Sequence, residues 1–295
     1  MIRKYAGDAK LYTIGFMILM VSSVLGFLII SYVPLILDVI VPMNVSRPRQ
    51  TVIALEYFVD EETYFLAILT HIVITLYVGA STIASFASIL IAYVLHTCAM
   101  FKIASHRIEH IFDEMQHMSK DIKQYILYNK LIHAVYIHRR AMDLANILTN
   151  SFATLYFVLL GFGVASTSFN ILNLFNAIIS LEKLDLLIFS DLIFLHLYYI
   201  FLGNYVGQNI IDNSIGVCQA TYNARWYTAP VCMQKWILFI MQRSSRKSSL
   251  TAGGLFDASL EGFATLMSMS ISYVMVLQSI GVHKESHEKN NNNHI

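Results

Sequence analysis

Five long apolar stretches restrict the possible folds of this chain more than any other feature of its sequence. A helix needs about 20 apolar residues to cross a hydrocarbon core of roughly 30 Å, and each stretch reaches that length with few charges inside it. The pattern predicts an all-α, polytopic transmembrane helical protein in which residues 1–282 form one transmembrane domain. The five predicted spans are Tyr12–Val41, Tyr64–Phe101, Leu144–Phe175, Leu186–Val217 and Leu255–Val282.

The composition supports contact with lipid and argues against several other classes. Hydrophobic residues make up 56% of the chain and charged residues only 13%, about half of what a water-exposed surface normally carries. A net charge of +1 gives no basis for binding nucleic acid, which needs clustered Lys and Arg. No polar residues converge as an enzyme site requires, so we expect neither catalysis nor a cofactor. Metal-binding or disulfide spacing is also missing from the three cysteines, Cys98, Cys218 and Cys232.

The distribution of Lys and Arg predicts the orientation of the chain in the membrane. Fifteen of the 20 residues lie in the N-terminal flank and in the second and fourth loops, which alternate along the chain. Because positive loops stay on the cytoplasmic side, we expect a cytoplasmic N-terminus and an extracellular C-terminus. The sequon Asn44-Val45-Ser46 falls in a loop that this count places outside, so Asn44 is a glycosylation candidate.

Two segments outside the spans have patterns of their own. The apolar run Trp236–Met241 is closed by Lys235 and Arg243 after six residues, which is too short to cross a bilayer. It predicts a short amphipathic helix at the membrane surface. Residues 283–295 are polar and contain an Asn run, which is typical of a disordered tail.

Carboxylates in apolar stretches are candidates for functional sites. Asp191 and Asp212 lie near the ends of the fourth stretch, so we expect solvated or interfacial positions, with hydrogen bonding between helices as the alternative. Asp257 and Glu261 are spaced one helical turn apart at the start of the last span. Two interpretations are open: the helix dipole stabilises their negative charges, or the two carboxylates attract cations toward a pore.

Five histidines lie in the second, basic loop. The spacing of His106 and His110 would suit zinc on a helix, but no further ligand pattern completes a site. A solvated helix face is the simpler interpretation of the five residues His106, His110, His117, His133 and His138.

Several short motifs, taken in order, resemble those of the insect odorant receptor family. The C-terminal motifs are the most specific, and the outer-loop motifs resemble those of wasp, bee and ant members. The similar segments are Asn44–Pro48, Glu62–Phe65, His138–Arg140, Thr221–Tyr227, Met241–Ser244, Leu250–Gly253 and Ser272–Ile280.

This resemblance implies a receptor architecture with seven spans, an inside N-terminus and an outside C-terminus. The five spans would then correspond to the third through seventh, and the first two would be missing, either through an incomplete gene model or in a truncated product. Members of the family form tetrameric cation channels with a shared co-receptor. The resemblance therefore implies an odorant-gated channel subunit in the plasma membrane of sensory neurons, with the co-receptor, a small volatile organic ligand and membrane lipid as partners.

The resemblance also assigns roles to particular residues. Ordinary helix packing is the alternative for the gate and pocket residues, and anchoring at the membrane surface is the alternative for the subunit anchor. The last span would carry the gate, the first would contribute a small-residue wall to an odorant pocket, and the fourth inner loop would anchor neighbouring subunits. A scaffold or nonfunctional membrane fragment, a gustatory-type receptor and a transporter are the other function classes. The implied gate residues are Val276, Gln278, Ser279 and Ile280; the pocket residues are Ser23, Gly26, Ile30, Tyr77, Ser81, Tyr198 and Tyr199; the anchor residues are Trp226, Tyr227, Trp236 and Arg243.

Overall fold

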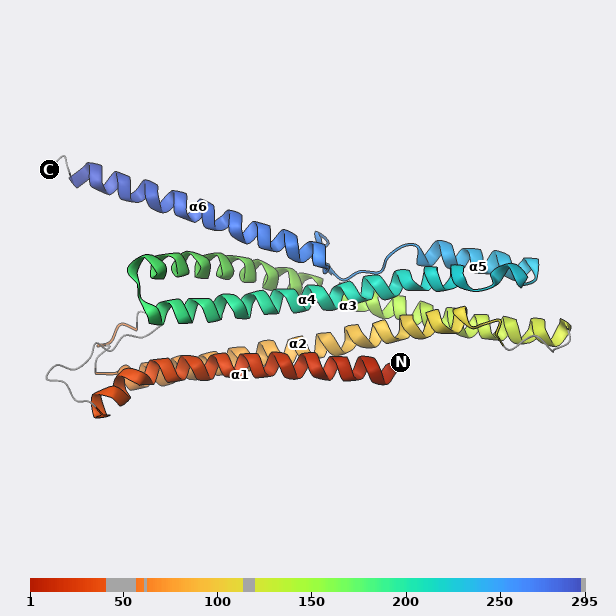
Figure 1. The fold of residues 1–295 in the computed structure, drawn as a ribbon, viewed down its shortest axis with the longest axis horizontal. Coiled ribbons are helices and arrows are strands. Elements are labelled where there is room, and N and C mark those ends of the chain that lie inside the picture. The colour runs from red at the N-terminus through yellow and green to blue at the C-terminus, as the bar shows by residue number, and fades with distance from the viewer. Residues whose placement is uncertain (41–56, 61–62, 114–119, 293–295) are drawn as a thin grey trace. The chain divides into compact units, whose positions relative to one another are not determined.

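A computed structural model describes residues 1–40, 57–60, 63–113 and 120–292 of the chain, most of which are helical (Figure 1). Between the fourth and the last long helix lie a 3₁₀ turn, η1 (Trp226–Thr228), a shorter helix, α5 (Val231–Ser244), and two short strands, β1 (Thr251–Ala252) and β2 (Phe256–Asp257). The long helices are α1 (Ile2–Ile40), α2 (Phe65–Glu109), α3 (Lys120–Ser180), α4 (Lys183–Asn223) and α6 (Leu260–Asn292).

Each predicted span overlaps one long helix that is long and apolar enough to cross a membrane. In the most apolar window of each of these helices, between 11% and 28% of the residues are buried inside the protein. The remaining apolar side chains need a nonaqueous environment, because exposing so much apolar surface to water is unfavourable. The structure thus confirms the predicted helical, polytopic membrane class, to which the two-residue strands add a minor β element.

The helices extend beyond the predicted spans. α3 has 61 residues and α2 has 45, so at 1.5 Å per residue α3 is about 90 Å long, far more than a bilayer. Polar turns at the start of α3 account for much of this excess. At the C-terminal end, α6 continues to Asn292, through part of the stretch expected to be disordered. This stretch contains no Pro, which would interrupt a helix.

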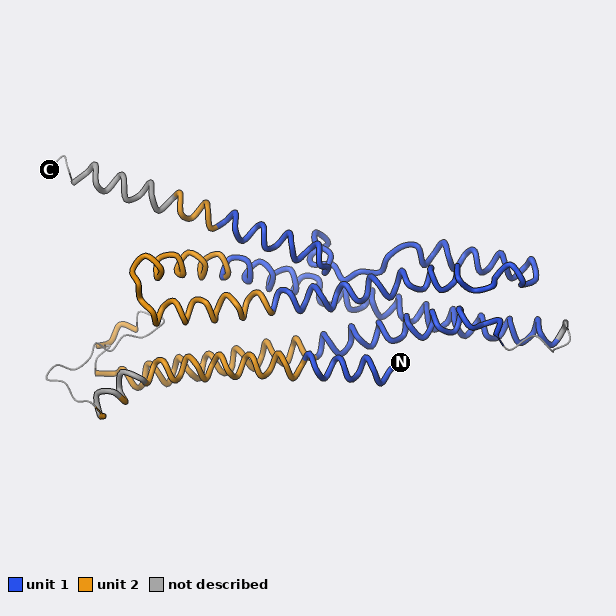
Figure 2. Tube along the Cα trace, in the orientation of Figure 1, with its two compact units in different colours: residues 1–12, 89–166, 199–273 blue, residues 13–88, 167–198, 274–295 orange. Residues whose placement is uncertain are grey.

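The described residues divide into two compact units, which are considered separately (Figure 2). Unit 1 comprises residues 1–12, 89–166 and 199–273, and unit 2 comprises residues 13–88, 167–198 and 274–295. Unit 1 contains α5 and both strands, and its interior includes fully buried side chains such as Val94, Phe101 and Ile210. Unit 2 buries Phe16, Leu69 and Ile72. Both units therefore have apolar interiors of their own.

The α5 helix confirms the short amphipathic helix expected around Trp236–Met241, with wider bounds. Its buried residues are Met233, Ile237, Ile240 and Ser244, spaced by three and four positions as on one helical face. Pro230 precedes the helix, and Val231 then occupies its first position. The opposite face leaves Phe239 68% exposed.

Candidate functional site

The segment that leads into α6 is a small hairpin bound to α3. Thr251 pairs with Asp257 and Ala252 with Phe256, and the turn between them has positive φ angles at Gly253 and Gly254. Two successive residues with positive φ favour glycine, as in the type I′ turns of hairpins. The backbone N–H of Gly253 donates to the carbonyl of Ala153 at 3.0 Å. The hairpin is therefore fixed to α3 by its main chain.

The first turn of α6 is held by side chains of α4. The amide oxygen of Asn204 accepts from the backbone N–H of Ser259 at 3.2 Å, and that of Gln208 accepts from Leu260 at 3.3 Å. The Ser259 hydroxyl accepts from the N–H of Gly262 at 3.0 Å, which is the usual bond of a helix N-cap. Three backbone N–H groups at or next to the start of α6 thus have defined acceptors.

The same contact brings two backbones together at Gly207. A Cβ atom added to this residue would lie 2.4 Å from both the Cβ and the carbonyl oxygen of Ala258. Glycine is therefore required by close approach, since no ordinary Cβ contact is that short. Roles for Asn204, Gly207 and Gln208 were not predicted from the sequence, although their spacing on one face of α4 is a signal of helix contact.

A polar pocket of about 380 Å³ opens beside this first turn and is lined by residues that include Gln208, Lys247, Asp257 and Glu261. The Lys247 ammonium donates to Asp257 at 2.5 Å, and the Ser249 hydroxyl donates to the other carboxylate oxygen at 2.8 Å. Partial burial opposes ionisation of Asp257, but these two hydrogen bonds and the charge of Lys247 outweigh it and lower its pKa. The hydrogen bond to Asp257 also raises the pKa of Lys247.

This geometry corrects the predicted arrangement of Asp257 and Glu261. Asp257 lies in β2, and α6 begins only at Leu260, because the hairpin and the Ser259 cap occupy the expected start of the span. The two carboxylates therefore do not form a pair on one helix. Lys247 neutralises Asp257, whereas Glu261 occupies the first turn of α6, where the helix dipole favours a negative charge.

In unit 2, part of the predicted odorant pocket lies where α1 meets α4. The Ser23 hydroxyl donates to the carboxylate of Asp191. The ring of Tyr198 stacks on that of Phe16 with centroids 6.3 Å apart, and its hydroxyl oxygen lies 3.5 Å from the position of a Cβ at Gly15. Asp191 therefore forms the inter-helix hydrogen bond that was the alternative expectation for it.

The other predicted pocket residues have different surroundings. Gly26 has no atom within 4 Å of an added Cβ, Tyr77 is 64% exposed, and Ser81 and Ile30 are half-buried. Tyr199 belongs to unit 1, whereas Ser23 and Tyr198 belong to unit 2. The structure thus associates Ser23 and Tyr198 with the same helix pair, α1 and α4, and leaves the remaining assignments as predictions.

The predicted gate lies on a part of α6 that is largely exposed. Val276 is 53% exposed, and Gln278 and Ser279 are exposed as well. The Ser279 hydroxyl donates to the carbonyl of Val276 at 2.8 Å, which satisfies it within the helix. Ile280 belongs to α6, but its side chain is outside the described residues.

The predicted subunit anchor lies wholly in unit 1. Trp226 is half-buried in η1 and its ring meets that of Tyr227 edge-on at 6.4 Å. Trp236 of α5 is 44% exposed, and the centroids of its ring and that of Tyr128 are 5.5 Å apart. Arg243 is exposed. Exposed aromatic residues together with Arg are the composition of protein interfaces and equally of membrane surfaces.

The described part of the basic loop between the second and third spans is helical except for a turn at residues 110–113. One of its histidines differs from expectation. His138 is 5% exposed and packs on Phe101 with ring centroids 5.9 Å apart, so it lies in the core rather than on a solvated face. The helical extension of α3 buries it. His106 and His110 are exposed neighbours, and no group of three potential metal ligands occurs in the described part of the chain.

Two further predictions concern Asp212 and Asn44. Asp212 is exposed and accepts a 2.8 Å hydrogen bond from Gln208 of its own helix, in line with the expected solvated position. The sequon at Asn44 lies outside the described residues.

The sequence of this chain is similar to those of known proteins. A family model described as 7tm Odorant receptor matches residues 8–271. Odorant receptor 22c of Drosophila melanogaster is 25% identical over 221 residues, which cover 72% of this chain and 53% of that protein. The odorant receptor coreceptor of Ooceraea biroi is 27% identical over 78 residues, covering 26% of this chain and 16% of its own length.

A solved structure has a similar fold. The insect olfactory receptor OR5 from Machilis hrabei in complex with eugenol superimposes with a TM-score of 0.69 and 17% identity, covering 95% of this chain and 68% of that chain. The resemblance at this identity concerns the fold.

Long lipid-compatible helices and these relatives define the class: a multi-pass helical membrane protein rather than an enzyme. The chain belongs to the seven-transmembrane odorant receptor family, because the family model matches most of its length. It spans about half the length of the curated relatives that it matches over most of its own residues.

Proposed function

We propose that this chain is a subunit of an odorant-gated cation channel that acts with a co-receptor in olfactory detection. The observation that carries the proposal is the family match over residues 8–271. Two facts support it: co-receptors occur among the relatives, and the fold resembles a solved olfactory receptor. We place the chain in the plasma membrane of sensory neurons, with its N-terminus in the cytoplasm and its C-terminus outside.

The exposure of Val276, Gln278 and Ser279 on α6 supports a role for them at the pore. We add Ile280 on the family resemblance alone. Val276 is half exposed in the single chain, so other subunits have room to complete a ring around it. A ring of apolar side chains closes a pore by excluding water, and a rotation that brings Ser279 or Gln278 inward admits hydrated ions. In the proposed heterotetramer, Trp226, Tyr227, Trp236 and Arg243 contact neighbouring subunits, and lipid covers the remaining apolar faces.

The meeting of α1 and α4 supports an odorant site in unit 2. Ser23 and Asp191 supply a polar contact, Tyr198 supplies an aromatic wall, and Gly26 leaves open space beside α1. We include Ile30, Tyr77, Ser81 and Tyr199 in this site on the family resemblance alone. A small volatile organic molecule that binds one channel state more tightly than the other would shift the equilibrium toward that state.

Co-expression with an odorant receptor coreceptor tests this function. Currents are recorded while an odorant panel is applied to cells that express the coreceptor with this chain, and to cells that express the coreceptor alone. We expect at least one odorant to evoke current only when the chain is present. Surface expression of the chain without any change in the coreceptor currents would contradict the proposal.

A paired substitution in α6 tests the gate. We expect Val276→Ala to raise the basal current or alter ion selectivity, because the smaller side chain widens an apolar constriction. The control is Ile271→Ala, which shortens an apolar side chain that is 54% exposed and lies more than one helical turn before Val276, on a different face of α6. Equal behaviour of the two variants would remove Val276 from the pore.

Accessible tags at the two ends test the orientation. An antibody applied to intact cells should stain a C-terminal tag, whereas an N-terminal tag should need permeabilised cells. Staining of both tags from the same side would mean that the chain crosses the membrane an even number of times, which five spans cannot do.

A further inference from the structure

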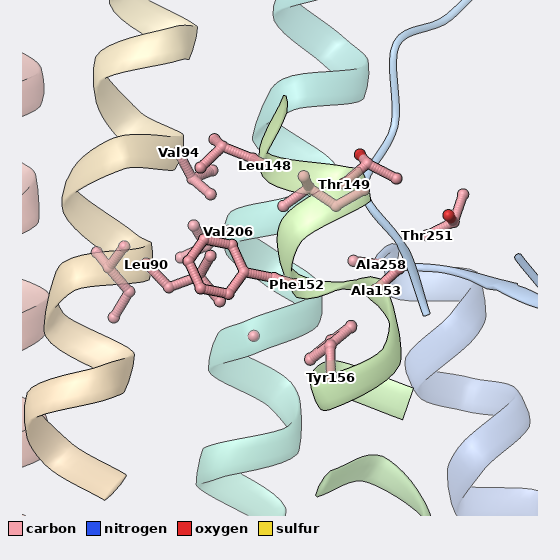
Figure 3. Close-up of a pocket in the computed structure, with 13 residues that line it drawn as sticks. Leu90, Val94, Leu148, Thr149, Phe152, Ala153, Tyr156, Val206, Thr251 and Ala258 are labelled. Atoms are coloured by element: carbon pink, nitrogen blue, oxygen red, sulfur yellow. The ribbon is translucent and has the colours of Figure 1, made fainter. Parts of the chain in front are cut away.

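Unit 1 contains an apolar pocket that shares no residue with the predicted odorant site. Its walls come from α2, α3, α4 and the hairpin segment that leads into α6 (Figure 3). The free volume is about 40 Å³, roughly three times the 10–15 Å³ that one water molecule needs. Its lining residues include Leu90, Val94, Phe152, Tyr156, Val206 and Ala258.

One polar atom in this pocket stands out because it is buried and unpaired. Tyr156 is 8% exposed, and its hydroxyl has no hydrogen-bond partner among the described residues. The hydroxyl oxygen lies beside Gly203, another lining residue, because a Cβ added there would be 3.2 Å from it. A buried hydroxyl without a partner is unfavourable, so native proteins normally supply one.

Water alone is a poor partner for this hydroxyl. A buried water is normally held by two to four polar groups, whereas Leu90, Val94, Phe152 and Val206 make most of the walls apolar. Thr149 and Thr251 also line the pocket, and the hydroxyl of Thr149 is already bonded to the carbonyl of Ser249 at 3.1 Å. A ligand with one oxygen and a hydrocarbon body matches these surroundings better, because it satisfies Tyr156 and fills apolar space.

We propose that this pocket binds a small aliphatic molecule with a single hydrogen-bonding oxygen, such as a short-chain alcohol or ketone. The oxygen pairs with the Tyr156 hydroxyl, and the hydrocarbon packs against Phe152 and Val206. The ligand also touches Ala258, two residues before α6 begins. A bound ligand therefore contacts the segment that positions the first turn of α6.

Photolabelling of the purified full chain in lipid nanodiscs tests the site without any measurement of current. The probe is a four-carbon alcohol that carries a diazirine, and adducts are located by mass spectrometry. We expect adducts on pocket residues, competed by unlabelled 1-butanol. Because the readout is covalent labelling, its result is independent of whether the chain conducts as proposed above.

Two variants identify the role of the hydroxyl. Tyr156→Phe keeps the ring and removes only the oxygen, so we expect 1-butanol to compete about fivefold to tenfold less well, the loss of one hydrogen bond. Competition by pentane, which has no oxygen, should not change. Tyr205→Phe is the matched control, because Tyr205 lies on α4 in the same unit but is not part of the pocket lining.

A third variant tests the cavity itself. Val206→Phe fills the pocket and should abolish labelling; if this larger side chain prevents folding, Tyr156→Phe still decides. Absence of adducts in the pocket, or equal effects of Tyr156→Phe and Tyr205→Phe, would overturn the proposal. Labelling by a diazirine fatty acid that 1-butanol does not compete would also overturn it, because a lipid chain would then be the occupant.

Discussion

Gly207 in unit 1 and Gly26 in unit 2 are both small residues within long apolar helices, yet their surroundings differ completely. A Cβ at Gly207 would meet the Cβ and carbonyl oxygen of Ala258 at 2.4 Å, whereas a Cβ at Gly26 would meet nothing within 4 Å. Small residues in membrane helices permit close packing, and they also leave space. Gly207 in unit 1 permits close packing, whereas Gly26 in unit 2 leaves open space.

This difference extends to the polar contacts of the two units. In unit 1, Asn204 and Gln208 bind the backbone at the start of α6, so side chains of one helix fix the main chain of another. In unit 2, Ser23 and Asp191 join two side chains, which can separate without disturbing a backbone. The contacts in unit 1 therefore hold the backbone at the first turn of α6, whereas the contact between α1 and α4 in unit 2 links side chains only.

The largest expected effect is that of adding one methyl group at Gly207. Gly207→Ala forces the backbone near Ala258 to move, and overpacking of this kind typically costs about 1–3 kcal/mol. The control is Gly216→Ala on the same helix, where a Cβ meets nothing within 4 Å. Thermal unfolding in detergent should show a large loss for the first variant only. Similar stability of both would mean that α4 does not contact the start of α6 closely.

Asn204→Ala should have the next largest effect. The variant leaves the backbone N–H of Ser259 without its acceptor in a buried position, at a cost of about 1–2 kcal/mol. Asn209→Ala is the comparison, since Asn209 donates to the carbonyl of Tyr205 in its own helix. The same unfolding assay should separate the two variants. If Asn209→Ala is equally harmful, the effect reflects α4 alone and not its link to α6.

The fold class was predictable from the sequence because length and apolarity suffice to identify a membrane helix. The ends of the helices were not, since they depend on polar turns that cross no membrane. α3 begins at Lys120, well before the predicted span, and this extension buries His138 against Phe101. Nothing in the local pattern around His138 distinguishes it from the exposed His106.

Some residues of the candidate sites were likewise predictable from the sequence, and others were not. Ser23 was found from local spacing and the family resemblance, and the structure gives it a partner in Asp191. The pocket at Tyr156 was missed because residues from three helices and a hairpin line it, and no short window of sequence contains them. The Lys247 and Asp257 pair was missed because the Gly253-Gly254 turn, which was not recognised, brings the two together.

The Lys247 and Asp257 pair predicts a smaller, pH-dependent effect in unit 1. Folding lowers the pKa of Asp257 from 3.8 and raises that of Lys247 from 10.5. The contribution of Asp257 is therefore present above about pH 3.8 and lost as the pH falls through its lower folded pKa. That of Lys247 is present below about pH 10.5 and lost as the pH rises through its higher folded pKa.

Because both side chains are partly exposed, we expect Lys247→Gln to cost under about 1 kcal/mol at pH 7. Unfolding measured from pH 7 to the most acidic pH at which the protein stays folded should show this difference shrinking toward the acid end. Lys235→Gln removes an exposed charge from α5 and should show a flat profile. A difference that stays constant down to strong acid would exclude the ion pair as its cause.

The smallest expected change in stability is at Gly26, and it returns to the difference between the two units. With open space around it, Gly26→Ala should leave the free energy of unfolding unchanged or raise it by up to about 1 kcal/mol, since alanine favours the helix. Gly79→Ala, at an equally open site of α2 in unit 2, is the control for stability. If Gly26 borders the odorant site, the added methyl should change the odorant response of the co-expressed receptor by roughly tenfold, whereas Gly79→Ala should not. A loss of stability as large as that of Gly207→Ala would mean that Gly26 is a packing residue after all.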